Sequence, residues 1–276
     1  MIRDILVTLP TGDAPSFALN YAVTVARTFD AHLTGVTFVQ DLAGAGALFD
    51  SATAIVLDDY RREVEAAAEA AKVRFEETWR REGLSAESMV LNAGTVSLPE
   101  LLARTARRFD LTILPQADPE DGRSGEVMIE AALLGSGRPI LIVPYFQEGG
   151  VKFDRILVCW DGSHNAARAI ADAMPFLTRA KQVEVVTVAT DGKADDSMAG
   201  LYIAQHLSRH GVIVEVRNIV AHGQDVSLRI RSHAAQQSAD LIVMGGYGHS
   251  RLNEIIWGGA TKTVIGRPPC WVMMSR

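Results

Sequence analysis

Two glycine clusters near the end of the chain have the spacing that best fits a chemical role. The first, Gly245–Gly248, directly follows Leu241–Met244, an apolar run with the pattern of a buried strand. The second, Gly258 and Gly259, comes after nine further residues, where a helical pattern begins. Glycines at a strand end and at a helix start let backbone N–H groups approach an anion, and the helix N-terminus adds partial positive charge. The two clusters therefore predict a site that holds a polyphosphate from both sides, which we interpret as a nucleotide site.

Two commoner phosphate motifs do not fit this stretch. The chain has no G-x-x-x-x-G-K-[ST] run, and a dinucleotide fingerprint G-x-G-x-x-G fails because Arg251 stands where its last glycine would be. An alternative also stays open, in which these glycines only make tight turns and helix caps.

Asp161 is a candidate to share that site, because of its place in the order of strands and helices. It follows the apolar strand pattern Ile156–Trp160 and precedes Ser163, which has the character of a helix N-cap. Open parallel sheets bind ligands beyond the carboxyl ends of their strands, where the strand order reverses. If the first and fourth strands of this half are neighbours there, Asp161 and Gly245–Gly248 face one crevice, and Asp161 can accept hydrogen bonds from a nucleoside. The alternative for Asp161 is a turn or cap residue.

An internal repeat organises the 276 residues. Three segments of the first half have similar counterparts in the second half: 3–7 with 154–158, 109–114 with 239–244, and 138–143 with 267–272. A polar, glycine-ended linker at 147–150 places the boundary between domains 1–148 and 149–276. Each half alternates apolar strands with helical patterns, which predicts an α/β fold with parallel sheets covered on both faces.

The second helix of the first half is unusually long, with a pattern from Leu57 to Glu82. Apolar residues recur at helical spacing, among them Tyr60, Val64 and Phe75. We expect an amphipathic helix that covers its own sheet; a helix that binds a partner protein is the alternative.

The spacing Gly245-x-x-Gly248, nine residues, Gly258 resembles the ATP-binding signature of the universal stress protein family, in which Ser or Thr follows the last glycine. Here Gly259 takes that place. The resemblance implies a Rossmann-like, doubly wound five-stranded parallel sheet of order 3-2-1-4-5, two of which form a pseudo-dimer in tandem members. It implies a stress-response protein that binds ATP, with any Mg²⁺ accompanying the phosphates, and with little or no catalysis beyond slow ATP hydrolysis. It assigns the nucleoside to Asp161, Val188, Met244 and Gly245, and the phosphates to Gly248, Gly258, Gly259 and Thr261.

The first half departs from this pattern at every binding position. Pro10 stands where Asp161 stands, and Leu114–Asp118 replaces the loop Met244–Gly248. Pro115 has no N–H to offer, and the acidic run that begins at Asp118 would repel phosphate. We expect this half to have lost nucleotide binding and to serve as a structural or partner domain.

Composition limits the partners. The net charge of −6 and the absence of a Lys/Arg-rich run argue against nucleic acid, and no apolar run approaches the length of a membrane span. The start of the chain lacks the pattern of a secretion signal, so we expect a soluble, cytoplasmic protein. Cys159 and Cys270 lie in strand-like runs without C-x-x-C spacing, which favours reduced, structural residues over redox or zinc chemistry.

Other functions stay open at this point. His164 and His249 flank the predicted pocket, so a slow ATP hydrolase or phosphotransferase that uses Asp161 or a nearby histidine is one alternative. The second is a structural tandem protein whose sites are both vestigial. Its support is Gly259, which stands where the family signature has Ser or Thr. The third is a small apolar ligand beneath the long helix of the first half. The sequence does not identify a protein partner.

The two repeats each end in an apolar strand pattern, Ile140–Val143 and Trp271–Met274. Exposed apolar edge strands invite pairing, so we expect these two strands to meet and to join the halves into a pseudo-two-fold unit. Such a unit is complete as a monomer, although its surface helices could still support a homodimer.

Overall fold

A computed structural model describes residues 1–11, 17–40, 51–117, 124–144, 152–189, 197–221, 223–246 and 268–276. Strands and helices alternate through both halves, as the apolar periodicity predicts. The first half consists of β1 (Asp4–Thr8), α1 (Phe17–Phe29), β2 (His32–Val39), α3 (Ser51–Glu82), β3 (Ala86–Asn92), α4 (Leu98–Ala106), β4 (Leu111–Pro115), α5 (Ser124–Gly135) and β5 (Ile140–Val143). The second consists of β6 (Arg155–Cys159), α6 (His164–Leu177), β7 (Gln182–Ala189), α7 (Ser197–Arg209), β8 (Val214–Val220), α8 (Val226–Gln236), β9 (Leu241–Gly245) and β10 (Trp271–Ser275).

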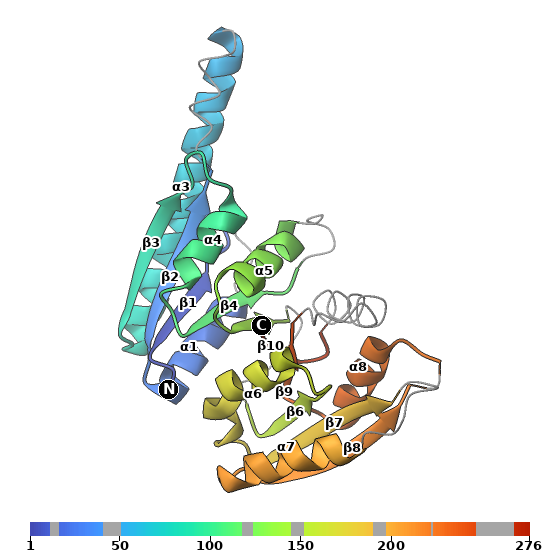
Figure 1. The fold of residues 1–276 in the computed structure, drawn as a ribbon. Helices are drawn as coiled ribbons and strands as arrows, with labels where there is room; N and C mark the ends of the chain where they lie inside the picture. Colours follow the sequence, from blue (N-terminus) through green and yellow to red (C-terminus); the bar gives the residue numbers. More distant parts are fainter. Residues whose placement is uncertain are drawn as a thin grey trace.

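All of these strands form one sheet of 10 strands in the order β3-β2-β1-β4-β5-β10-β9-β6-β7-β8 (Figure 1). Each half thus has the predicted order 3-2-1-4-5, and neighbouring strands within a half are parallel. The two halves join through β5 and β10, which pair antiparallel with Ile142 opposite Val272. The prediction that the last strands of the two repeats meet is therefore confirmed. The boundary at 148/149 stays a prediction, because residues 145–151 lie outside the described part of the chain.

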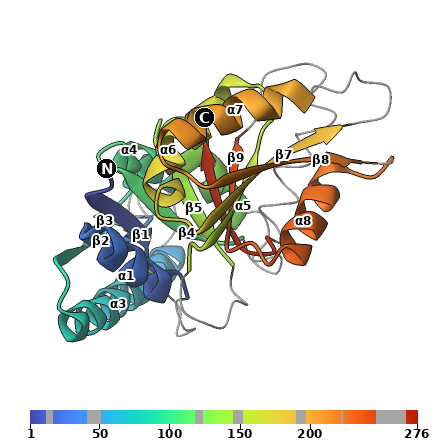
Figure 2. The same cartoon turned by 90° about the horizontal axis from the view of Figure 1, so that it is seen from below.

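Helices cover both faces of this sheet (Figure 2). Residues of α1, α3, α6 and α7 share one buried apolar cluster, and residues of α4, α5 and α8 share another on the opposite face. The strands supply both clusters alternately, since Ile156 and Val158 belong to the first whereas Leu157 and Cys159 belong to the second. Nearly continuous apolar strands are the expected consequence of burial on both faces.

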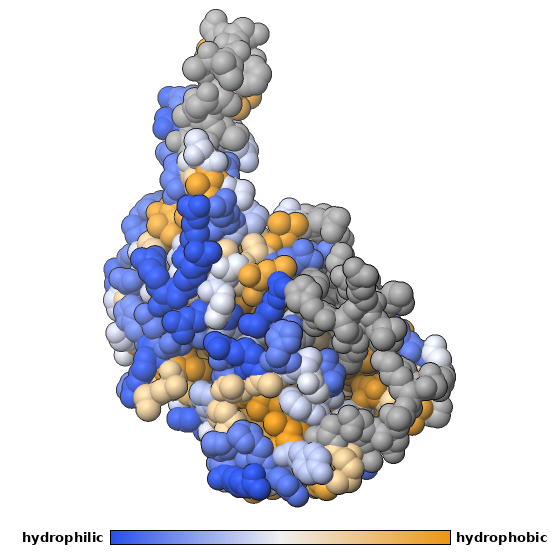
Figure 3. Space-filling view, viewed as in Figure 1, coloured by the Kyte–Doolittle hydropathy of each residue, from blue (hydrophilic) through white to orange (hydrophobic). Residues whose placement is uncertain are grey.

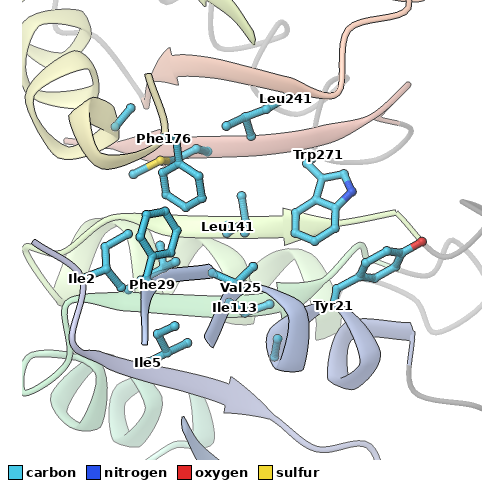
Figure 4. Close-up of a cluster of buried hydrophobic side chains, with 14 of the residues drawn as sticks. Ile2, Ile5, Tyr21, Val25, Phe29, Ile113, Leu141, Phe176, Leu241 and Trp271 are labelled. Atoms are coloured by element: carbon cyan, nitrogen blue, oxygen red, sulfur yellow. The ribbon is translucent and has the colours of Figure 1, made fainter. Parts of the chain in front are cut away.

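Aromatic side chains close the first of these clusters across the junction of the halves (Figure 4). The rings of Phe29 at the end of α1 and Phe176 in α6 meet edge to face, with centroids 4.8 Å apart. Tyr21 of α1 and Trp271 of β10 form a second such pair at 4.6 Å. One apolar core therefore runs through both repeats, in addition to the strand pairing.

Helix α3 departs from the expectation. It begins at Ser51 and not at Leu57, and its first half projects away from the sheet (Figure 1). Phe75 is fully buried, and it packs where a Cβ on Gly35 would lie only 3.0 Å from its ring. Tyr60, on the same apolar pattern, is 52% exposed. Only the C-terminal part of α3 covers the sheet; along the projecting part, apolar patches lie among hydrophilic side chains (Figure 3).

No helix in the described part of the chain is long and apolar enough to cross a membrane. The helical pattern expected from the second glycine cluster onward falls within residues 247–267, which are outside the described part.

Candidate functional site

Strands β6 and β9 lie side by side in the sheet, with Ile156 opposite Leu241 and Val158 opposite Val243. From this pair the sheet continues to β7 on one side and to β10 on the other, so the strand order reverses between them. The sequence prediction depended on this adjacency, and the adjacency is confirmed. Asp161 follows β6 and Gly245 ends β9, so both lie at the carboxyl ends of neighbouring strands, the position at which such sheets bind ligands.

Asp161 is exposed at the turn into α6. Its Oδ1 accepts a hydrogen bond from the backbone N–H of Ser163 at 2.9 Å, and Ser163 Oγ in turn accepts from Ala166 N at 3.1 Å as the N-cap of α6. Asp161 thus shapes the turn, as the alternative interpretation expects. Its Oδ2 makes no hydrogen bond within the described residues, so one carboxylate oxygen remains available to a hydroxyl donor.

The other two positions assigned to a nucleoside differ in what they can offer. Val188 lies half-buried near the end of β7, on the far side of β6 from β9. The side chain of Met244 is 1% exposed and packs with Leu157 and Cys159 in the core. Only the backbone of Met244 can therefore reach a ligand at this edge.

Gly245 and Gly246 stand where two structural elements come close to the end of β9. A Cβ on Gly245 would lie 2.7 Å from the backbone nitrogen of Ala166 in α6. A Cβ on Gly246 would lie 2.6 Å from Leu133 Cδ2, in α5 of the first half. These glycines therefore have a packing function, whatever else they do.

Asn165 ties this junction together, and sequence reasoning missed it. It is 1% exposed in the first turn of α6, and its Nδ2 donates to the carbonyl oxygen of Gly246 at 2.6 Å. The N–H of Gly246 donates to Ser275 O in β10 at 2.8 Å. A polar residue on the apolar face of a predicted helix was the available signal, because buried amides are hydrogen-bonded to something.

The remaining predicted residues lie outside the described part of the chain. Gly248, Gly258, Gly259, Thr261 and His249 all fall within residues 247–267. The phosphate half of the predicted site thus stays a prediction. His164 is exposed at the start of α6, and no group of three or more His, Cys, Asp or Glu residues in the described part could hold a metal ion.

Backbone hydrogen bonds align the two halves position by position. Leu9 N donates to Val36 O at 2.8 Å, as Trp160 N donates to Val186 O at 2.9 Å, so the next residues, Pro10 and Asp161, are equivalent. A second pair of hydrogen bonds corresponds in the same way: Gln116 N donates to Val143 O at 2.8 Å in the first half, and Gly246 N donates to Ser275 O in the second. Pro115 therefore occupies the place of Gly245, in agreement with the alignment made from the sequence.

Both cysteines are free and buried, as expected for structural residues. Burial raises the pKa of the Cys159 thiol to about 12, and burial likewise raises the pKa of Cys270. Neither thiol forms a nucleophilic thiolate near neutral pH.

Comparison with known proteins connects this fold with a family. The model of the universal stress protein family matches residues 152–276, which contain Asp161 and both glycine clusters. The second half of the chain is therefore similar to the universal stress protein family. Universal stress protein Slr1230 of Synechocystis is 27% identical over 175 residues, which are 61% of this chain and 58% of that protein. The chain thus spans 58% of the length of this curated relative.

Solved structures show the same fold over the whole chain. A universal stress protein from Archaeoglobus fulgidus DSM 4304 has a TM-score of 0.74 at 18% identity, covering 99% of this chain and 96% of that one. A functionally unknown protein from Pseudomonas aeruginosa PAO1 has a TM-score of 0.59 at 17% identity, with 99% and 92% covered. The likeness in fold to these structures therefore extends over the first half, which the family model does not match.

Proposed function

We propose that this chain is a universal stress protein, an ATP-binding regulatory protein that holds one adenine nucleotide in its second half and none in its first. One observation carries the proposal. Asp161 and Gly245 lie at the carboxyl ends of adjacent strands where the strand order reverses, whereas prolines, Pro10 and Pro115, occupy the equivalent positions of the first half. A proline in place of Asp161 removes a carboxylate, and a proline in place of Gly245 removes a backbone N–H.

The described residues fit the nucleoside part of the ligand. The free Oδ2 of exposed Asp161 suits the ribose hydroxyls, and the half-buried end of β7 at Val188 and the backbone at Met244 and Gly245 offer a surface for the base. The phosphates would be held by Gly248, Gly258 and Gly259, with Thr261 beside them, through backbone N–H groups at the start of a helix. Mg²⁺ would come with the phosphates, since magnesium is usually bound through carboxylates and substrate phosphates.

A competing explanation uses the same residues without a ligand. Asp161 shapes its own turn, and Gly245 and Gly246 make room for α6 and for Leu133. If these roles were the whole explanation, the second half would be a structural repeat like the first. An experiment therefore has to separate a ligand-binding carboxylate from a turn-forming one.

Asp225 supplies the matched control for that experiment. It is exposed at the N-cap of α8, and its Oδ1 accepts from Ser227 N at 2.7 Å, as Asp161 Oδ1 accepts from Ser163 N. Both aspartates accept the backbone N–H two residues further along, although Asp225 is itself the N-cap of α8 whereas Ser163 is the N-cap of α6. Asp225 follows β8 at the edge of the sheet, two strands from β6. Asp161→Ala and Asp225→Ala each remove a hydrogen bond of this kind, whereas only Asp161→Ala should reduce ATP binding.

The full chain would be purified, and nucleotides released from it on denaturation would be identified and quantified by mass spectrometry. We expect adenine nucleotide from the unaltered protein and from Asp225→Ala, and little from Asp161→Ala. Equal amounts from both variants would refute the assignment of Asp161. Measuring ATP turnover in the same preparations tests the alternative of a slow hydrolase, which predicts phosphate release that Asp161→Ala abolishes.

The proposal also covers how the protein acts on a partner and where it is found in the cell. Occupancy of the second half would change the surface that it presents to a protein partner, and the first half would serve as a structural or partner domain. We place the protein in the cytoplasm, where reduced cysteines such as the buried, free Cys159 and Cys270 are usual.

A further inference from the structure

A cleft with a volume of about 580 Å³ lies where the two halves meet, beside the N-terminus of the chain. Its first wall comes from the first half, including Phe29 at the end of α1 and Arg138 before β5. Its second wall comes from the second half, including Met174 in α6 and Arg179 just beyond that helix. Apolar surface is visible beside the N-terminus in this region (Figure 3). Clefts of this volume between structural units are typical places for small ligands.

This cleft is separate from the nucleotide site proposed above. Asp161 precedes the start of α6, whereas Arg179 follows its end, and a helix of 14 residues spans about 21 Å. A ligand in the cleft would therefore contact neither Asp161 nor Gly245.

Arg179 is a cation that is positioned but not neutralised. Its guanidinium lies over the ring of Phe29, 4.8 Å from the centroid, and its Nη1 donates to Pro175 O at 3.1 Å. Within the described residues it has no carboxylate partner. The contact with Phe29 crosses the junction of the halves, so the charge is held at the apolar wall of the cleft.

The carboxylates of the cleft leave this positive charge uncompensated. Asp110 Oδ2 accepts the backbone N–H groups of Arg3 and Asp4, and its Oδ1 lies 4.0 Å from Arg138, at the outer limit of an ion pair. Asp172 is paired with Arg168 at 2.8 Å. Both acids are thus engaged, while Arg138 and Arg179 can each still donate to an anion.

We propose that this cleft binds a small organic anion, a carboxylate or sulfonate on a compact apolar body. Arg138 and Arg179, one from each half, bind the acidic group, and Phe29 and Met174 contact the apolar body. Because the walls belong to different repeats, the bound anion stabilises their junction.

Naphthalene-1-sulfonate, which combines these two features, is a suitable probe for titration calorimetry of the full chain without nucleotide. We expect saturable binding of one molecule per chain, weakened about tenfold or more by Arg179→Ala, since hydrogen bonds to charged groups are the strong ones. Arg138→Ala should also weaken binding of the probe. Uncharged 1-naphthol should bind more weakly than the sulfonate.

Two control variants make the result specific. Arg229→Ala removes a half-buried arginine of α8 that donates to Val220 O, and Asp161→Ala alters the proposed nucleotide site. Both should bind the probe like the unaltered chain, and circular dichroism would check that each variant is folded. The proposal is overturned if the unaltered chain shows no saturable binding, or if both Arg179→Ala and Arg138→Ala bind as tightly as Arg229→Ala. Neither outcome depends on whether ATP binds.

Discussion

The side-chain amide of Asn165 donates to the carbonyl oxygen of Gly246 at 2.6 Å, which joins the first turn of α6 to the residue after β9. The two residues are 81 positions apart in the sequence. Because α6 begins directly after Asp161, this hydrogen bond fixes the distance between the two edges of the proposed nucleotide crevice. The nucleotide binding proposed for the second half should therefore depend on Asn165, a residue that does not itself need to touch the ligand.

Asn165→Ala should lower the free energy of unfolding by about 1–3 kcal/mol, because it removes the partner of a buried carbonyl. It should also weaken ATP binding, since Gly246 would no longer be held against α6. Asn218→Ala is the control, because Asn218 also bonds through its side chain, to Thr187 Oγ1, but in an exposed position. Urea denaturation and ATP titration of both variants test this. Equal losses of stability and of ATP affinity in the two variants would show that the Asn165 hydrogen bond contributes no more than the exposed one.

Gly248→Val and Gly258→Val should abolish ATP binding and leave the fold largely intact, because a branched side chain blocks close approach of the backbone to a phosphate. Calorimetric titration and circular dichroism measure the two effects separately. Unchanged affinity in either variant would favour the interpretation of that glycine as a turn or cap residue.

The two parts of α3 should respond differently to truncation of an aromatic side chain. Phe75→Ala removes a fully buried ring packed over Gly35 and should cost about 3–5 kcal/mol of stability. Tyr60→Ala, in the projecting part, should change stability by no more than about 0.5 kcal/mol. A comparable loss for Tyr60→Ala in chemical denaturation would mean that the projecting part packs against something in solution.

Ending the chain after Pro269 should cause aggregation. That change removes β10, which pairs with both β5 and β9 and carries the buried Trp271. The edges of β5 and β9 would then be exposed and apolar, and such edges pair with other chains. Light scattering after gel filtration would detect this; a truncated chain with unchanged mass and stability would show that β10 is not the element that joins the halves.

Sequence reasoning predicted the sheet because its determinants are local or repeated. The repeat and the apolar strand patterns predicted parallel sheets covered on both faces, and the resemblance to the universal stress protein family implied the strand order. The need to cover two edge strands predicted the pairing of β5 with β10. The projection of α3 escaped prediction because the apolar spacing of Tyr60 and Phe75 does not record where the sheet beneath a helix ends. The contact between His233 Nε2 and Glu184 Oε2, 2.7 Å long and largely buried, escaped for a different reason. Its partners are 49 positions apart, and nothing in either local pattern indicates the other.

In the candidate site, too, some positions were predictable from the sequence and others were not. Strand order was enough to bring Asp161 and Gly245 to one edge of the sheet. The sequence did not show what Asn165 and Leu133 contact, because their partner Gly246, in the first glycine cluster, is far from both along the chain.

The number of ATP molecules bound per chain tests the central claim most directly. Calorimetric titration of the full chain with ATP should give one site, and the Asp161→Ala variant should lose it while Asp225→Ala keeps it. Two equivalent sites would contradict the loss of binding in the first half. No binding by the unaltered chain, or equal affinity in the two variants, would contradict the nucleotide site itself.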